Sequence, residues 1–181
     1  MSSGDLAHDL FVITLNFWRK EETVRKELKV GLLRKGAKPP KRAYPTDAGA
    51  DVFYCYDSER RDWHIGDESE FWINAGESCV LPTGIKVEVP RGHMLEVKNK
   101  SGIASKRQLL VGACVIDSGY DGEVFINLHN VGTTTQKVYP GDKLAQVVLV
   151  PVETCDFVCT GDELNTDTFR GAGGFGSTGD R

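Results

Sequence analysis

The sequence lacks the features that mark several classes of protein. None of its five cysteines pairs with another in the Cys-x-x-Cys spacing of a zinc or redox site. Its four histidines are scattered without the spacing of metal ligands, which argues against a zinc site built by the protein alone. An odd number of such cysteines is typical of free thiols in a reducing compartment.

A secretion signal and a long apolar run are also missing. The first nine residues carry no basic cluster, and the apolar run at residues 10–18 is too short and too interrupted to span a membrane. We therefore expect no membrane partner and an intracellular, soluble protein, in the cytoplasm, or in the nucleus if the source is eukaryotic.

An excess of positive charge is absent as well. The chain has 22 basic and 26 acidic residues and a net charge of −4. Without a global basic field, binding to long nucleic acid is not expected, and any charge that binds a nucleotide must be local. A length of 181 residues suits one domain with an appendage.

After residue 28 no helical period of a dozen residues can be found. Short β-type runs punctuated by turn residues take its place, and the strands that they predict are residues 28–33, 51–56, 71–73, 77–81, 85–89, 94–98, 109–111, 123–128 and 144–152. Many closely spaced strands favour an all-β fold, a sandwich or a jelly-roll-like barrel.

Three segments differ from this pattern. Residues 1–27 carry apolar residues at helical spacing but also a β-branched run, so we treat them as an N-terminal extension of uncertain structure, packed on the domain or bound to a partner. Residues 57–70 are mostly polar, with Trp63 as the one expected anchor, and are predicted to form an inserted surface loop. The β domain is assigned to residues 28–166 and a glycine-rich C-terminal arm to residues 167–181.

The arm has a composition that suits a nucleotide. It carries Arg170, Phe175, Ser177, Thr178 and glycine at five of the eleven positions after Arg170. Backbone N–H groups and hydroxyls suit phosphate, a guanidinium suits polyphosphate charge, and an aromatic ring suits stacking on a base. By itself the segment is either a frayed tail or a nucleotide-binding arm.

Two further segments carry charged side chains that could belong to a site. In residues 48–51 a carboxylate, Asp51, follows a glycine turn, either as a turn-stabilising residue or as part of a site. In residues 98–104, Lys100, Ser101 and the N–H groups near Gly102 form a compact anion-binding set, unless the segment is an ordinary polar turn.

Two more segments join β runs to polar side chains. In residues 112–124, Asp117 directly follows Val115 and Ile116, so we expect it at the edge of the core, where a carboxylate could serve as a general base. Tyr120 is either core packing or a flat platform for a sugar. In residues 140–146, Gln146 is polar among aliphatic residues.

Taken together and in order, these five segments resemble the motifs of the trimeric dUTPase family. The matching residues are 48–51, 100–104, 115–123, 141–146 and 170–179, within a resemblance that covers about residues 28–181. It implies a β jelly-roll homotrimer with active sites shared between subunits, each closed by the flexible C-terminal arm of a neighbour. It also implies hydrolysis of dUTP to dUMP and pyrophosphate, which controls dUTP and supplies dUMP for thymidylate synthesis.

The resemblance implies a role for each matching residue. The catalytic residues would be Asp117, which activates the attacking water, Asp51, which reaches Mg²⁺ through a water molecule, and Arg170. The ion itself would be held chiefly by triphosphate oxygens and waters. The implied substrate-binding residues are Lys100, Ser101, Gly102, Gly112, Val115, Tyr120, Gln146, Phe175, Gly176, Ser177 and Thr178.

Two positions depart from the family pattern. Lys100 stands where arginine is usual, which exchanges a planar fork for a point charge. Cys114 stands where glycine is common in the hairpin that reads uracil, so its side chain either narrows the base pocket or points into the core. We expect an ordinary β conformation at Cys114, because a positive φ would strain it.

Two alternatives remain at this point. A dCTP deaminase shares the fold but needs an acid in the strand after the third motif, and residues 125–130 contain none. A regulatory protein of the same fold would bind a partner, with residues 1–27 or 57–70 as the contact surface.

Overall fold

The computed structural model describes residues 27–59, 70–161, 168–169 and 171. Within these ranges the regular secondary structure is almost entirely β. The elements are β1 (Lys29–Leu32), β2 (Ala50–Phe53), β3 (Phe71–Ile73), β4 (Ser78–Pro82), β5 (Ile85–Glu88), β6 (His93–Asn99), α2 (Ser101–Arg107), β7 (Leu109–Val111), β8 (Val115–Ile116), β9 (Phe125–Asn130), β10 (Gln136–Val138) and β11 (Lys143–Pro151). The predicted all-β class is confirmed.

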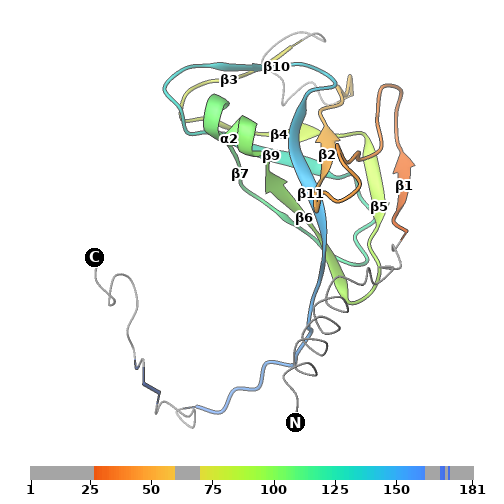
Figure 1. Ribbon diagram of the computed structural model, residues 1–181, viewed down its shortest axis with the longest axis vertical. Helices are drawn as coiled ribbons and strands as arrows, with labels where there is room; N and C mark the ends of the chain where they lie inside the picture. Colours follow the sequence, from red (N-terminus) through yellow and green to blue (C-terminus); the bar gives the residue numbers. More distant parts are fainter. Residues whose placement is uncertain (1–26, 60–69, 162–167, 170, 172–181) are drawn as a thin grey trace, which may run out of the picture. The chain divides into compact units, whose positions relative to one another are not determined.

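The strands form antiparallel sheets that bring distant parts of the sequence together. The largest sheet has the order β2-β11-β6-β8, and a second has the order β4-β9-β7. Two-stranded ribbons pair β1 with β5 and β3 with β10. In Figure 1, β11 runs between β2 and β6, while α2 follows directly after β6.

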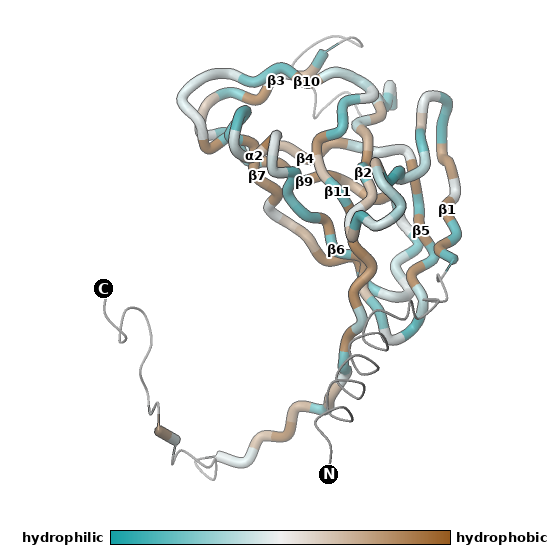
Figure 2. The backbone as a smooth tube through the Cα atoms, in the orientation of Figure 1, coloured by the Kyte–Doolittle hydropathy of each residue, from teal (hydrophilic) through white to brown (hydrophobic). Residues whose placement is uncertain are grey.

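The core lies between the sheets because the strands alternate apolar and polar residues. Strand β9 shows this alternation: Ile126 and Leu128 are fully buried, whereas His129 is exposed. Brown and teal stretches alternate accordingly along the backbone in Figure 2. The largest fully buried side chains are Tyr54, Ile73, Leu81, Ile85, Leu95, Leu109, Ile126, Leu128, Leu144, Val52, Val124 and Val138.

Three short elements were not predicted as separate units. Helix α2 has seven residues and buries none of them, so it leaves no apolar period in the sequence. Strand β8 has only two residues, and β10 has a single apolar residue among its three, so neither forms a recognisable apolar run. The ends of several predicted strands also shift by up to three residues, because the sheet partners decide where pairing stops.

The first residue of the predicted polar insertion at residues 57–70 is not on the surface. Asp57 is buried and accepts a hydrogen bond of 2.8 Å from Arg34, so the surface loop does not start there. Residues 60–69, including Trp63, and the extension at residues 1–26 lie outside the described residues. The chain divides into two compact units, one ending at Pro151 and one beginning at Val152.

All five cysteines are free thiols, as the sequence predicts. Burial raises the pKa of the Cys79 thiol to about 12, so this thiol stays protonated and unreactive near neutral pH. Among the described residues, no helix has the length and apolar character needed to cross a membrane.

Candidate active site

The larger sheet places a row of polar residues on one face. Asp51 on β2 is paired with Gln146 on β11, and Gln146 is paired with Lys98 on β6. Lys41 forms an isolated antiparallel bridge with Asp51. Residues directly opposite each other in antiparallel strands project from the same face. The sheet therefore joins Asp51 and Gln146, which are far apart in the sequence, into one polar surface.

Two lysines neutralise the Asp51 carboxylate. Lys100 Nζ donates a hydrogen bond to Oδ1, and Lys143 Nζ lies 3.3 Å from Oδ2. Two ammonium groups against one carboxylate leave this cluster with one net positive charge, which suits an anionic ligand. Sequence reasoning gave Lys143 no role, although its place in the segment 141–146 was a signal that could have found it.

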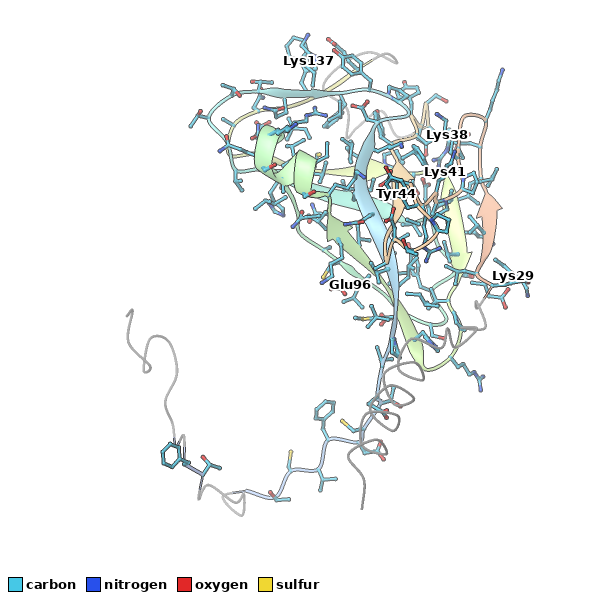
Figure 3. The ribbon with its side chains drawn as sticks, in the orientation of Figure 1. Lys29, Lys38, Lys41, Tyr44, Glu96 and Lys137 are labelled. Atoms are coloured by element: carbon cyan, nitrogen blue, oxygen red, sulfur yellow. The ribbon has the colours of Figure 1, made fainter. Side chains whose placement is uncertain are left out.

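More positive charge surrounds the same strand. The ammonium groups of Lys38 and Lys143 lie 5.4 and 6.0 Å from the centre of the Phe53 ring on β2. Figure 3 labels Lys38 and Lys41 near this strand. A chain with a net charge of −4 thus carries a local basic region beside Asp51.

Contact with Gln146 explains the glycine in the segment before Asp51. Gln146 Nε2 donates a hydrogen bond of 2.8 Å to the carbonyl oxygen of Asn99. A Cβ atom at Gly49 would overlap the side-chain amide of Gln146. Two of the five sequence segments are therefore interlocked, and a side chain larger than hydrogen at position 49 would displace Gln146.

The first turn of α2 offers open surface next to Lys100. Ser101 is exposed, and no atom lies within 4 Å of the position that a Cβ atom of Gly102 would take. N–H groups in the first turn of a helix have no partner within the helix. Ser101 and Gly102 can therefore be approached closely by an oxyanion held at Lys100.

A second group of candidate residues lines a cavity of about 200 Å³ next to β8. This volume is smaller than that of a usual ligand pocket, so it suits only part of a nucleotide. Three of the predicted site residues, Val115, Asp117 and Tyr120, line it. The other lining residues are Val97, Ala113, Cys114, Ile116, Glu123, Val124 and Phe125.

Asp117 differs from its expected environment. It is exposed, whereas we expected it at the edge of the core; only the preceding Ile116 packs partly against the core. No hydrogen bond or ion pair from another described residue engages its carboxylate. An unpaired carboxylate beside a cavity is free to take a proton from a bound water.

Tyr120 is an exposed residue and does not belong to the core. The residue is 46% exposed, and its hydroxyl donates a hydrogen bond of 2.9 Å to the carbonyl oxygen of Glu123. A Cβ atom at Gly122 would overlap the Tyr120 ring. The glycine therefore lets the ring fold back over its own turn, where it forms a fixed platform.

A buried ion pair supports the far end of the same segment. Arg34 donates two hydrogen bonds to the Glu123 carboxylate, at 2.7 and 2.6 Å, and a third to Asp57. The N–H group of Gly84 donates a further bond of 2.7 Å to Glu123. The hydrogen bonds with Glu123 raise the pKa of Arg34 above its ordinary value. Sequence reasoning missed Arg34 and Asp57, because no local pattern links them to Glu123.

This ion pair yields a prediction about stability. We expect Arg34→Met to lower the free energy of unfolding by about 3–5 kcal/mol, because it removes the guanidinium that bonds both oxygens of the buried Glu123 carboxylate. Urea denaturation at neutral pH measures the change. Lys35→Met, at the exposed neighbouring position, is the matched control and should stay close to wild type. An equal effect of both substitutions would contradict a specific role for Arg34.

Cys114 has the ordinary backbone conformation that we expected. Among the described non-glycine residues only Gln108 has a positive φ. Cys114 lines the cavity and is not part of the buried core cluster. Of the two alternatives for this side chain, the structure favours the one in which it borders the pocket.

In the described part of the chain, the second group of candidate residues stands apart from the first. The cavity beside Asp117 and Tyr120 is lined by neither Asp51, Lys100 nor Gln146. The predicted arm residues Arg170, Phe175, Gly176, Ser177 and Thr178 lie outside the described residues. In the described part of the chain, no group of three or more His, Cys, Asp and Glu side chains could hold a metal ion.

Comparisons with known proteins place the chain in a family. A family model described as dUTPase matches residues 35–179. The deoxyuridine 5'-triphosphate nucleotidohydrolase of Chlamydia trachomatis serovar L2 is 37% identical over 150 residues, which cover 82% of this chain and 95% of that protein. The protein of the same name from Gloeothece citriformis is 39% identical over 155 residues, covering 84% and 97%.

Solved structures give the same result. The dUTPase of Staphylococcus bacteriophage 80alpha with dUpNHpp superposes with a TM-score of 0.72 at 26% identity, covering 86% of this chain and 99% of that one. A mutant dUTPase of phage phi11 of S. aureus, whose structure reveals the coordination of a structural Mg(II) ion, has a TM-score of 0.64 at 26% identity and covers 77% and 99%.

Proposed function

The chain belongs to the dUTPase family and hydrolyses dUTP to dUMP and pyrophosphate, and we propose that Asp117 is the carboxylate that activates the attacking water. The observation that carries this assignment is the exposed, unpaired carboxylate of Asp117 beside a cavity that Tyr120 also lines. By this reaction the enzyme would limit intracellular dUTP and supply dUMP for thymidylate synthesis.

The cavity beside β8 would bind the nucleoside end of the substrate. The backbone of residues 112–115 would read the uracil edge, and the Tyr120 ring would lie beneath the deoxyribose. Asp117 would also accept a hydrogen bond from the 3′-hydroxyl, which fixes the sugar next to the water that it activates. Cys114 lines this cavity, and its side chain would narrow the base side and so favour a small pyrimidine.

The basic surface around Asp51 would bind the triphosphate. Lys100 and Lys143 supply positive charge, Gln146 supplies a side-chain amide, and Ser101 and Gly102 supply N–H groups close to an approaching oxygen. Charge that develops on the phosphate oxygens during water attack would be stabilised by these fixed groups.

The residues present fit a magnesium ion held mainly by the substrate. Asp51 is the carboxylate in this basic surface, and each of its oxygens already faces a lysine. Asp51 would therefore reach Mg²⁺ through a water molecule, while phosphate oxygens provide most of the ligands. When bound, Mg²⁺ supplies charge neutralisation along the triphosphate.

Active sites shared between the subunits of a homotrimer would unite the two groups of residues. One subunit would contribute the nucleoside cavity, a second the basic surface around Asp51, and the third its C-terminal arm. The separation of the two groups within one chain supports this proposal. Arg170, Ser177 and Thr178 would then clamp the terminal phosphates, with Gly176 beside them, and Phe175 would stack on uracil.

A panel of nucleotides tests the proposed function. Pyrophosphate release is measured with Mg²⁺ from dUTP, dTTP, dCTP and dATP under identical conditions. We expect rapid turnover of dUTP and much slower turnover of the others. A protein that is inert on dUTP would sink the proposal.

Lys100 provides a more detailed prediction. We expect Lys100→Arg to tighten binding of a nonhydrolysable dUTP analogue about five- to tenfold, because a guanidinium can bond Asp51 and a phosphate oxygen at once. Calorimetric titration measures this change. Lys106→Arg, at the exposed end of α2, is the control for adding a guanidinium alone. Unchanged or weaker binding by Lys100→Arg would refute the expectation.

A second function remains a separate proposal. Phage dUTPases similar to this chain control transfer of virulence genes by a proto-oncogenic G protein-like mechanism. By analogy, this chain would also bind a protein partner, through residues 1–27 or 57–70. A pull-down that compares the full chain with a 1–27 deletion would separate this activity from catalysis. Deamination of dCTP is disfavoured, because β9 carries no acidic residue.

A further inference from the structure

Asn127, in the middle of β9, holds the beginning of the segment that lines the nucleoside cavity. Its Oδ1 accepts a hydrogen bond of 3.0 Å from the N–H group of Ala113, and its Nδ2 donates one of 3.0 Å to the carbonyl oxygen of Cys79 on β4. We propose that Asn127 is a positioning residue that sets the affinity and selectivity of the enzyme for the base. This inference rests on the proposed function of the cavity.

The side-chain amide is matched to its two partners. A backbone N–H group can only donate, and a backbone carbonyl can only accept, so the orientation of the amide is fixed by chemistry. An aspartate could accept the hydrogen bond from the N–H group of Ala113, but its second oxygen would repel the carbonyl oxygen of Cys79. A leucine could form neither hydrogen bond. Asparagine joins β4 to the cavity segment with both hydrogen bonds satisfied.

The hydrogen bonds lie where the segment leaves the sheet. Strand β7 ends at Val111, and the N–H group of Gly112 still bonds the backbone carbonyl of Asn127 at 3.0 Å. At Ala113 it is the side chain of Asn127, and no longer its backbone carbonyl, that accepts the hydrogen bond. The carbonyl of Cys114 then accepts a hydrogen bond of 2.8 Å from Val97 on β6. Asn127 therefore decides the direction in which residues 113–115 enter the cavity wall.

Close packing at Gly112 supports this role. A Cβ atom at Gly112 would overlap both the side-chain oxygen of Asn127 and the His129 ring. Gly112 was expected among the substrate-binding residues, and the structure gives its small size a different reason. The glycine lets the backbone lie directly against Asn127.

Asn127 is not one of the residues that line the cavity, so it acts on the substrate only through the backbone of residues 112–115. It also has no contact with Asp117 or with the lysines around Asp51 among the hydrogen bonds and ion pairs of the described residues. Its loss should therefore alter how the base is held, and leave the water attack at the phosphate intact.

Three variants test the proposal. We expect Asn127→Leu to raise the KM for dUTP about fivefold and to lower the preference for dUTP over dCTP by a similar factor, with kcat changed less than about twofold. Asn127→Asp keeps the acceptor for Ala113 and should restore most of the KM, although both variants lose the bond to Cys79. Asn74→Leu, which removes a side-chain amide at a turn away from the cavity, should match wild type in KM.

Each outcome either supports or overturns the proposed role of Asn127. An unchanged KM and selectivity in folded Asn127→Leu, or an equal rise in KM for the Leu and Asp variants, would overturn the inference. If Asn127→Leu does not fold, Asn127→Ser, whose hydroxyl is too short to reach both partners, takes its place. The activity of the wild type on dUTP distinguishes the two proposals. An inactive wild type would contradict the proposed function, whereas an active wild type with an unaffected Asn127→Leu variant would contradict only the role of Asn127.

Discussion

Asp117→Asn is expected to lower kcat for dUTP about a thousandfold while the protein remains folded. The amide has the shape of the carboxylate but cannot accept a proton from water. Because Asp117 is exposed and its carboxylate has no ion pair or hydrogen bond with another described residue, the substitution should leave the free energy of unfolding close to its original value. Single-turnover pyrophosphate release measures the chemical step directly.

Two measurements serve as controls: the affinity of Asp117→Asn for a substrate analogue, and the activity of a variant at a neighbouring carboxylate. A nonhydrolysable dUTP analogue should bind Asp117→Asn within about tenfold of wild type, since only one hydrogen bond to the 3′-hydroxyl is altered. Asp121→Asn removes an exposed carboxylate from the same turn and should keep nearly full activity. If Asp121→Asn lost the activity and Asp117→Asn kept it, the general base would be misassigned.

Truncation after Phe169 has the second large expected effect. We expect kcat/KM for dUTP to fall at least about a hundredfold, because the site loses the guanidinium of Arg170, the Phe175 ring and two hydroxyls that would close over the triphosphate. The loss should appear in steady-state pyrophosphate release. The core cluster of the described residues lies between residues 28 and 149, so we expect the trimer to persist in size-exclusion chromatography.

A shorter truncation is the matched control. Removal of only Asp180 and Arg181 leaves residues 170–179 intact and should preserve turnover. Full activity of the protein that ends at Phe169 would refute the role proposed for the arm, whereas loss of activity in both truncations would point to the final residues instead.

The sequence was a good guide where the signal is local. Strand β7 was predicted at its observed bounds, because a run of aliphatic residues between turn signals is recognisable without its partners. The seven-residue helix α2 was missed, because it buries no side chain and so imposes no period on the sequence. Asp117 was singled out as a candidate general base, which stays a prediction. Its expected place at the edge of the core was wrong, because Asp117 is exposed and only the preceding Ile116 packs partly against the core.

Side-chain partners across the fold were beyond reach of the sequence alone. Lys143 against Asp51, Arg34 against Glu123, and Asn127 against Ala113 are each joined across strands or loops that are distant in the chain. Lys143 lies in the segment 141–146, but no local pattern distinguishes Arg34 or Asn127 from ordinary polar surface residues.

The sequence by itself determined the all-β class, the order of the five motifs and the family, because residue types and turn spacing express these properties locally. Only the tertiary structure decided that Asp51 and Gln146 lie on one surface while Asp117 and Tyr120 line a separate cavity. The physical reason is strand register: a shift of one residue turns every side chain to the opposite face, and register is fixed by packing between strands that meet only in the folded chain.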